Sequence, residues 1–131
     1  MLNRPAEISH LYRQLVRQHL NDLLDRKIER MWDIDDFAEQ LCIHPIHLSN
    51  TIKNHTGISA CGILQLEIAR VARKLVANLS NPIQDIAFLL DFEPSQFTKW
   101  YKRVVGLTPK QFRTQIKRGT TTQILNTSLL E

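Results

Sequence analysis

Residues 81–108 have the sequence NPIQDIAFLLDFEPSQFTKWYKRVVGLT, and this stretch decides the fold because it matches an earlier one. Residues 32–59, WDIDDFAEQLCIHPIHLSNTIKNHTGIS, align with it without a gap at an offset of 49 residues. Ile, Asp, Ala, Leu, Pro, Lys and Gly recur at equivalent places in the two stretches. Each copy has a short apolar helix, a break, and a proline (Pro45 or Pro94) that suits the first turn of a second helix. The pattern predicts two copies of one helix-turn-helix unit.

The helix starts and breaks follow from capping chemistry. Asp33 is a good N-cap for the first helix of the first copy, and Asn81, followed by a proline, is the expected cap in the second. The breaks fall at Cys42 and Asp91.

The second helix of each copy has two faces on a wheel of about 100° per residue. Leu48 and Ile52 form the apolar face in the first copy, and Phe97, Trp100 and Tyr101 form it in the second. The opposite faces display Ser, Asn, Thr and Lys, the side-chain types that reach base edges and phosphates in a major groove. The candidate base-reading residues are Ile46, His47, Ser49, Asn50, Ser95, Gln96, Thr98 and Lys99.

One connecting helix is expected over residues 59–79. A helix of about 19 residues spans about 29 Å, which is near the roughly 34–36 Å between successive major grooves on one side of B-DNA. Such a helix could hold two recognition helices one DNA turn apart. The apolar positions that support it are Ile63, Leu66, Val71, Leu75 and Leu79.

Residues 8–31 predict a long amphipathic helix, with apolar residues at i, i+3 and i+4. Its C-terminal (far) end is expected to pack on the first copy. Its N-terminal (near) end has a surplus apolar stripe that could form a homodimer or bind a partner protein. The predicted domain organisation is residues 1–58 for this helix and the first helix-turn-helix unit, 59–79 for the connecting helix, 80–118 for the second unit, and 119–131 for a flexible tail.

The charge is unevenly distributed along the chain. The net charge is +4, but residues 1–98 hold 10 basic and 12 acidic residues, whereas residues 99–118 hold 7 basic and no acidic ones. A basic block in and after an aromatic-rich helix indicates a surface that faces phosphates. The candidate phosphate-contacting residues are Lys53, Arg70, Lys74, Lys102, Arg103 and Lys110.

Several classes of function are excluded. The chain has no apolar run near 18 residues and no signal-peptide pattern, so we expect a cytoplasmic protein with no membrane partner. Its two cysteines fit a reducing compartment. No arrangement of catalytic residues is recognisable, and we expect no enzyme activity and no cofactor.

Cys42, His44 and His47 form a C-x-H-x-x-H pattern but have no fourth ligand at a convincing spacing. We therefore expect no metal site, but a buried Cys42 with two partly exposed histidines. The remaining histidines, His10, His19 and His55, are expected on the surface.

Taken together, these residues resemble the DNA-binding domain of AraC-type transcription regulators over roughly residues 20–116. The resemblance lies in FAEQLCIHPIHLSNTIKNHTGIS and, more specifically, in IQDIAFLLDFEPSQFTKWYKRVVGLTPKQFR. It departs from the family at the turn glycine, which is replaced by Cys42 and Asp91, and in a second turn one residue shorter than usual.

The resemblance implies an all-α fold of seven helices, with two helix-turn-helix subdomains joined by a long connecting helix and preceded by the N-terminal helix. It also implies binding to double-stranded DNA in consecutive major grooves, and usually transcription activation with RNA polymerase as a partner. The chain has no room for a separate effector-binding domain, so a stand-alone form is expected. The alternative interpretation is a helical protein-interaction adaptor, whose basic block would contact an anionic protein surface.

Overall fold

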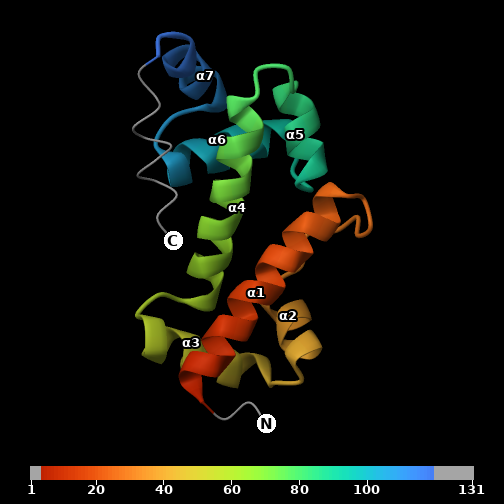
Figure 1. Cartoon of the computed structure of the whole chain (residues 1–131), viewed down its shortest axis with the longest axis vertical. Coiled ribbons are helices and arrows are strands. Elements are labelled where there is room, and N and C mark those ends of the chain that lie inside the picture. The colour runs from red at the N-terminus through yellow and green to blue at the C-terminus, as the bar shows by residue number, and fades with distance from the viewer. Residues whose placement is uncertain (1–3, 120–131) are drawn as a thin grey trace. The chain divides into compact units, whose positions relative to one another are not determined.

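The computed structural model describes residues 4–119, and every regular element in that range is a helix (Figure 1). This confirms the predicted all-α class. The predicted tail lies outside the described residues, except for Gly119. No described helix is both long and apolar enough to cross a membrane. The helices are α1 (Pro5–Leu24), α2 (Ile34–Leu41), α3 (Pro45–Thr56), α4 (Ala60–Ala77), α5 (Ile83–Leu89), α6 (Pro94–Val105) and α7 (Pro109–Lys117).

The chain divides into two compact units, residues 1–67 and residues 68–131, here called the N-terminal unit and the C-terminal unit. The N-terminal unit contains α1, α2, α3 and the start of α4, and the C-terminal unit contains the rest of α4 with α5, α6 and α7. Each unit therefore holds one complete helix-turn-helix pair, α2 with α3 or α5 with α6.

Helix α1 packs on α3 and α2 in the N-terminal unit. Its near end is not surplus as predicted, because Ile8 and Tyr12 are 1% and 0% exposed. The Tyr12 hydroxyl donates to the backbone oxygen of Ala60 at 2.7 Å, and its ring meets that of Phe37 edge to face. Burial raises the pKa of Tyr12, so this hydroxyl stays a donor. The whole length of α1 thus belongs to the core of this unit.

The predicted extent of this helix was wrong at its far end, because α1 stops at Leu24 and Arg26 has a left-handed φ of 61°. The chain then turns back and stacks the Trp32 indole on the His19 imidazole, with centroids 4.5 Å apart. The backbone N–H of Trp32 donates to His19 Nε2 at 3.0 Å. His19, predicted on the surface, is therefore buried.

Helix starts were predicted correctly in one copy and not in the other. Asp33 caps α2 and forms a reciprocal capping box with Asp36, which confirms that prediction. Helix α5 instead has Pro82 as its N-cap, without a side-chain cap. The Asn81 side chain donates to the backbone oxygen of Leu75 at 3.2 Å, so it binds the C-terminal end of α4 and does not cap α5.

The connecting helix α4 is continuous, but part of its predicted apolar stripe is not buried. Leu66 is 52% exposed, and Leu79 lies beyond the helix end and is 45% exposed. Glu67 is buried among the apolar side chains and accepts two hydrogen bonds from the Arg17 guanidinium, at 3.0 and 3.2 Å. A buried carboxylate needs such a partner to offset its desolvation.

The core of the C-terminal unit is aromatic. Phe97 and Tyr101 are fully buried on α6, and Trp100 is 5% exposed. The Phe92 ring lies 5.5 Å from that of Phe97, and Tyr101 meets Phe112 of α7 at 5.9 Å. These contacts hold one side of α6 against the core, and its other side faces outward.

Candidate nucleic-acid interface

The two turns that lead into α3 and α6 are built in the same way. Cys42 and Asp91 have φ of 57° and 66°, the left-handed conformation that glycine, the residue usual here in the resembled family, adopts most readily. The residue after each turn donates its N–H five residues back, Ile43 to Ala38 at 3.0 Å and Phe92 to Ala87 at 2.8 Å. This is the Schellman pattern of helix ends. In both turns the left-handed residue lies three residues before the proline that begins the next helix, as the gapless repeat requires.

Helices α3 and α6 have the same length and register. Each has 12 residues, begins at a proline, and ends before a glycine with positive φ, 80° at Gly57 and 99° at Gly106. Residues 45–50 and 52–54 of α3 have the same degree of burial as their counterparts in α6, position by position. The fully buried pairs are Leu48 with Phe97 and Ile52 with Tyr101. Both helices are thus fixed on equivalent apolar faces and display equivalent outer faces.

The candidate base-reading residues lie on these outer faces. The pair Ser49 and Thr98 is half-buried, and Thr98 donates its hydroxyl to the backbone oxygen of Pro94 in its own helix. Ile46 is 65% exposed, which is unusual for a large apolar side chain. Their contacts with bases stay predictions. The exposed candidates are Ile46, His47, Asn50, Ser95, Gln96 and Lys99.

The start of α3 has a cap that the sequence analysis missed. His44 is the N-cap, and its Nδ1 accepts the backbone N–H of Ile46 at 3.2 Å. Histidine is not among the usual N-cap residues, so no familiar signal marked it. The equivalent Glu93 makes no side-chain cap bond at the start of α6.

The residues of the C-x-H-x-x-H pattern do not form a cluster in the described part of the chain. Cys42 is exposed, and not buried as predicted, because it occupies the turn and not the apolar face of a helix. Within residues 4–119, no three His, Cys, Asp or Glu side chains lie close enough to share a metal ion.

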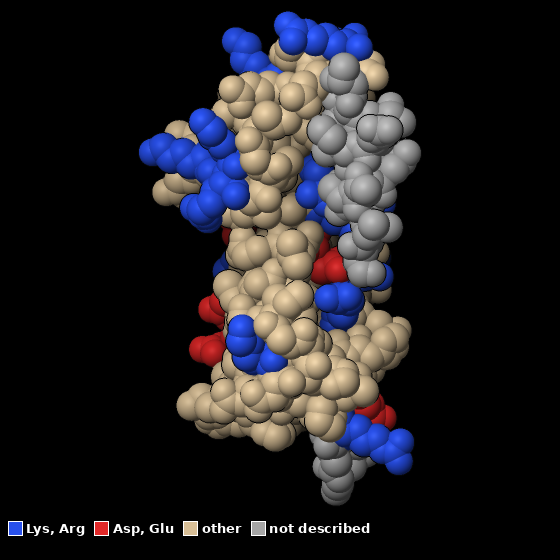
Figure 2. All heavy atoms as spheres, turned by 90° about the vertical axis from the view of Figure 1, so that its left-hand side faces the viewer, with Lys and Arg blue, Asp and Glu red and all other residues tan. Residues whose placement is uncertain are grey.

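The phosphate candidates differ in their surroundings. Lys74, Lys102, Arg103 and Lys110 are exposed, whereas Arg70 is half-buried on α4. Lys53 is exposed, and its Nζ donates to the backbone oxygen at the C-terminal end of α3 at 3.1 Å. Figure 2 shows Lys and Arg side chains in several separate groups around the C-terminal unit.

Arg113, one of the seven cations of the basic block, points inward. Its guanidinium donates to the backbone oxygens of Val76 at 2.9 Å, Asn78 at 3.1 Å, and Asn81. It thereby joins α7 to the end of α4 and the start of α5. The remaining cations of the block are exposed, and they are Lys99, Lys102, Arg103, Lys110, Lys117 and Arg118.

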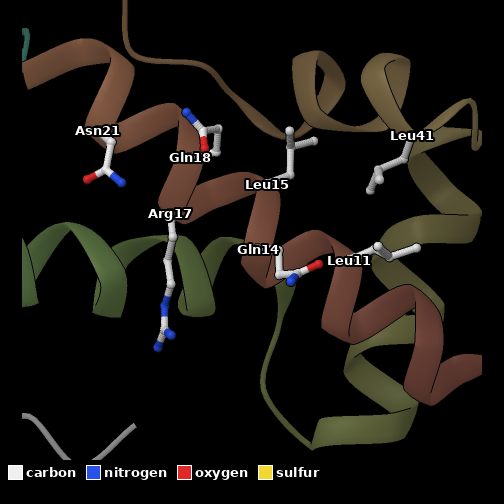
Figure 3. Close-up of a pocket in the computed structure, with 7 residues that line it drawn as sticks. All are labelled: Leu11, Gln14, Leu15, Arg17, Gln18, Asn21 and Leu41. Carbon is white, nitrogen blue, oxygen red and sulfur yellow. The ribbon is translucent and has the colours of Figure 1, made fainter. Parts of the chain in front are cut away.

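A surface groove lies between α1 and α2 in the N-terminal unit (Figure 3). It contains leucines and side-chain amides, and its charged residue Arg17 is already paired with Glu67. The groove has no His, Cys, Asp or Glu, so it offers no acid–base or metal chemistry. Its lining is Leu11, Gln14, Leu15, Arg17, Gln18, Asn21 and Leu41.

Comparison with known proteins agrees with this geometry. A helix-turn-helix domain family matches residues 37–115, which is more than half of the chain. The arabinose operon regulatory proteins of Escherichia coli K12 and Salmonella typhimurium LT2 are each 24% identical over 99 residues, or 75% of this chain. The aligned part spans only 34% and 35% of those relatives.

Solved structures share the fold. The C-terminal domain of AraT, a response regulator from Geobacillus stearothermophilus, has a TM-score of 0.71 at 26% identity, covering 82% of this chain and 84% of that one. A DNA-binding transcriptional dual regulator from E. coli K-12 has a TM-score of 0.62 at 17% identity, covering 79% and 93%. The family match, the likeness to the AraT domain and the paired helix-turn-helix units lead to one conclusion: the chain belongs to the AraC-type helix-turn-helix family of DNA-binding transcription regulators.

Proposed function

We propose that this chain binds double-stranded DNA at specific sequences, places α3 and α6 in successive major grooves, and activates transcription. The observation that supports this most directly is the matched outer faces of α3 and α6, which hold polar side chains outward in the same register. A helix needs such a face to bring hydrogen-bonding groups to base edges. The names of the curated relatives, both operon regulatory proteins, agree with a role in transcription control.

The proposed contacts divide into two kinds. The exposed residues in the first two turns of α3 and α6 would contact bases, as the N-terminal residues of recognition helices do. The exposed cations farther along α6 and at the start of α7 would contact phosphates, which position the protein without reading sequence. In this proposal Lys102, Arg103 and Lys110 belong to the second kind.

Two protein partners remain predictions. RNA polymerase is the expected partner of an activator. A homodimer through α1 would have to use the part of this helix that the core leaves partly exposed, which includes Leu11 and Leu15. The apolar residues Ile8, Tyr12 and Val16 are buried and not available for it.

Salt dependence of DNA binding tests the proposed function. If the six candidate cations each neutralise one phosphate, log Kd should change by about 5 per decade of salt, so binding weakens about 10³-fold between 50 and 200 mM salt. Fluorescence anisotropy with a labelled duplex, on random-sequence and selected DNA, measures this slope. Binding that is absent on both duplexes, or that does not respond to salt, would instead support the protein-interaction adaptor.

A further inference from the structure

The repeat allows the two recognition helices to be compared residue by residue. Asn50 of α3 and Lys99 of α6 occupy the same position in their helices and are both exposed. Ile46 and Ser95 form a second exposed pair, one helical turn earlier. Because the turns and buried faces are equivalent, each pair differs in side-chain chemistry and not in backbone setting.

The outer face of α3 suits an A·T pair. An Asn side chain can donate an amide N–H to adenine N7 and accept through its oxygen from the adenine N6 amino group, and this bidentate pairing selects adenine. Ile46 lies one turn before Asn50 on the same face. Its exposed side chain suits the C5-methyl group of a thymine at a neighbouring pair, which is the apolar feature of the major groove.

The outer face of α6 suits a different pair. Lys99 can donate to guanine O6 and N7, which are both acceptors. Ser95 offers a hydroxyl, which can donate or accept and provides no apolar surface for a methyl group. Gln96, next to Ser95, can still read an adenine elsewhere in this box. The two boxes therefore differ at the base pairs that face Asn50 and Ile46 in one box and Lys99 and Ser95 in the other.

If the proposed function holds, on which this step rests, we infer which base each of these side chains selects. Helix α3 reads an adenine through Asn50 with a thymine methyl group against Ile46, and α6 reads a guanine through Lys99. The two boxes therefore differ at the position that Asn50 and Lys99 share.

Selection from a random duplex library tests the inference with the wild type, Asn50→Lys and Lys99→Asn. The wild type should recover two boxes with an adenine at the first test position and a guanine at the second. Asn50→Lys should change the first box to guanine and leave the second unchanged, while Lys99→Asn should do the reverse. Each correct base should be preferred about 5- to 150-fold in Kd over the replaced one.

Matched controls separate base reading from charge. Asn54→Lys adds the same charge to the exposed surface of α3, and Lys102→Asn removes one from α6. Both should change affinity for all sequences without changing the selected base. If Asn50→Lys behaves like Asn54→Lys, or if the wild type selects two identical boxes, the inference is wrong while DNA binding stands. If no duplex is enriched at all, the proposed function itself fails.

Removing one methyl group from the DNA tests the contact with Ile46. Replacing the thymine of the first box by uracil removes only its methyl group and should weaken wild-type binding about fourfold. The Ile46→Ala variant should bind both duplexes equally. Equal binding of both duplexes by the wild type would remove Ile46 from the reading of this box.

Discussion

At the scale of single residues, His19 couples protonation to packing. It is 1% exposed, stacks on Trp32, and accepts the Trp32 N–H through Nε2. Burial lowers the pKa of His19 below its usual 6.5, the carboxylates of Asp22 and Asp36 oppose this shift, and the Arg30 guanidinium adds to it. A proton on Nε2 would remove the acceptor for Trp32.

This lowered pKa predicts a loss of stability in mild acid. The unfolded chain binds a proton at this imidazole at higher pH than the folded chain, so the free energy of unfolding falls as the pH drops below about 6.5. The fall ends once the pH is below the folded-state pKa. Urea denaturation of the wild type and His19→Phe, between pH 8 and pH 5, measures it. The variant should lose this pH dependence and, at pH 8, about 1 kcal/mol for the missing hydrogen bond.

His55→Phe is the matched control, because His55 is exposed on α3. It should retain the pH dependence of the wild type. If His19→Phe shows the same acid sensitivity as the wild type, the effect belongs to other groups and His19 does not cause it.

At the scale of elements, the turn before α3 predicts a stabilising substitution. Cys42 has φ 57° and ψ 39°, a conformation that costs a side-chain-bearing residue about 1 kcal/mol. Cys42→Gly should therefore raise the free energy of unfolding by about 0.5–1 kcal/mol, as measured by urea denaturation.

Gly57→Ala provides the control at the other end of α3. Its φ is 80°, and an added Cβ would meet nothing within 4 Å, so the change tests backbone conformation alone. It should lower stability by about 1 kcal/mol. A neutral or destabilising Cys42→Gly, beside a destabilising Gly57→Ala, would show that the thiol has packing contacts worth more than the strain.

The elements that the sequence predicts well are those specified by neighbouring residues. The repeat fixes both turns and the helices α3 and α6, since prolines, glycines and apolar positions recur at one spacing. The end of α1 was not predictable in this way, because Ile28 and Met31 continue the apolar period after the helix has stopped. The contact between His19 and Trp32 that turns the chain back is not visible in any local pattern.

The outward placement of the candidate residues was predictable for a related reason. The aromatic residues fix the orientation of α6 about its axis, so the outward placement of Ser95 and Lys99 follows from sequence. Arg113 belongs to the basic block but points inward, which the sequence did not indicate because its carbonyl partners lie 32 to 37 residues away in the chain. The pair of Arg17 with Glu67 spans 50 residues and was equally hidden. Charged residues at such distances are placed by tertiary packing.

At the scale of the whole molecule, charge is divided unequally between the two units. The N-terminal unit has 7 Lys and Arg against 9 Asp and Glu, a net charge of −2. The C-terminal unit has 10 against 4, a net charge of +6. Attraction to phosphates should therefore come mainly from the C-terminal unit, while the N-terminal unit depends more on base contacts.

A pair of double variants tests this division. Replacing Lys102 and Arg103 by alanine should lower the salt slope of DNA binding by about 2, because each phosphate contact contributes about 0.9. The loss of affinity should be similar on all sequences, since phosphates are the same everywhere. Replacing Arg26 and Lys27, two exposed cations after α1, removes the same charge from the N-terminal unit and should leave the slope unchanged. Anisotropy titrations at several salt concentrations measure both. Equal reductions from the two double variants would mean that the net charge of the chain, and not a phosphate-contacting surface on α6, sets the salt dependence.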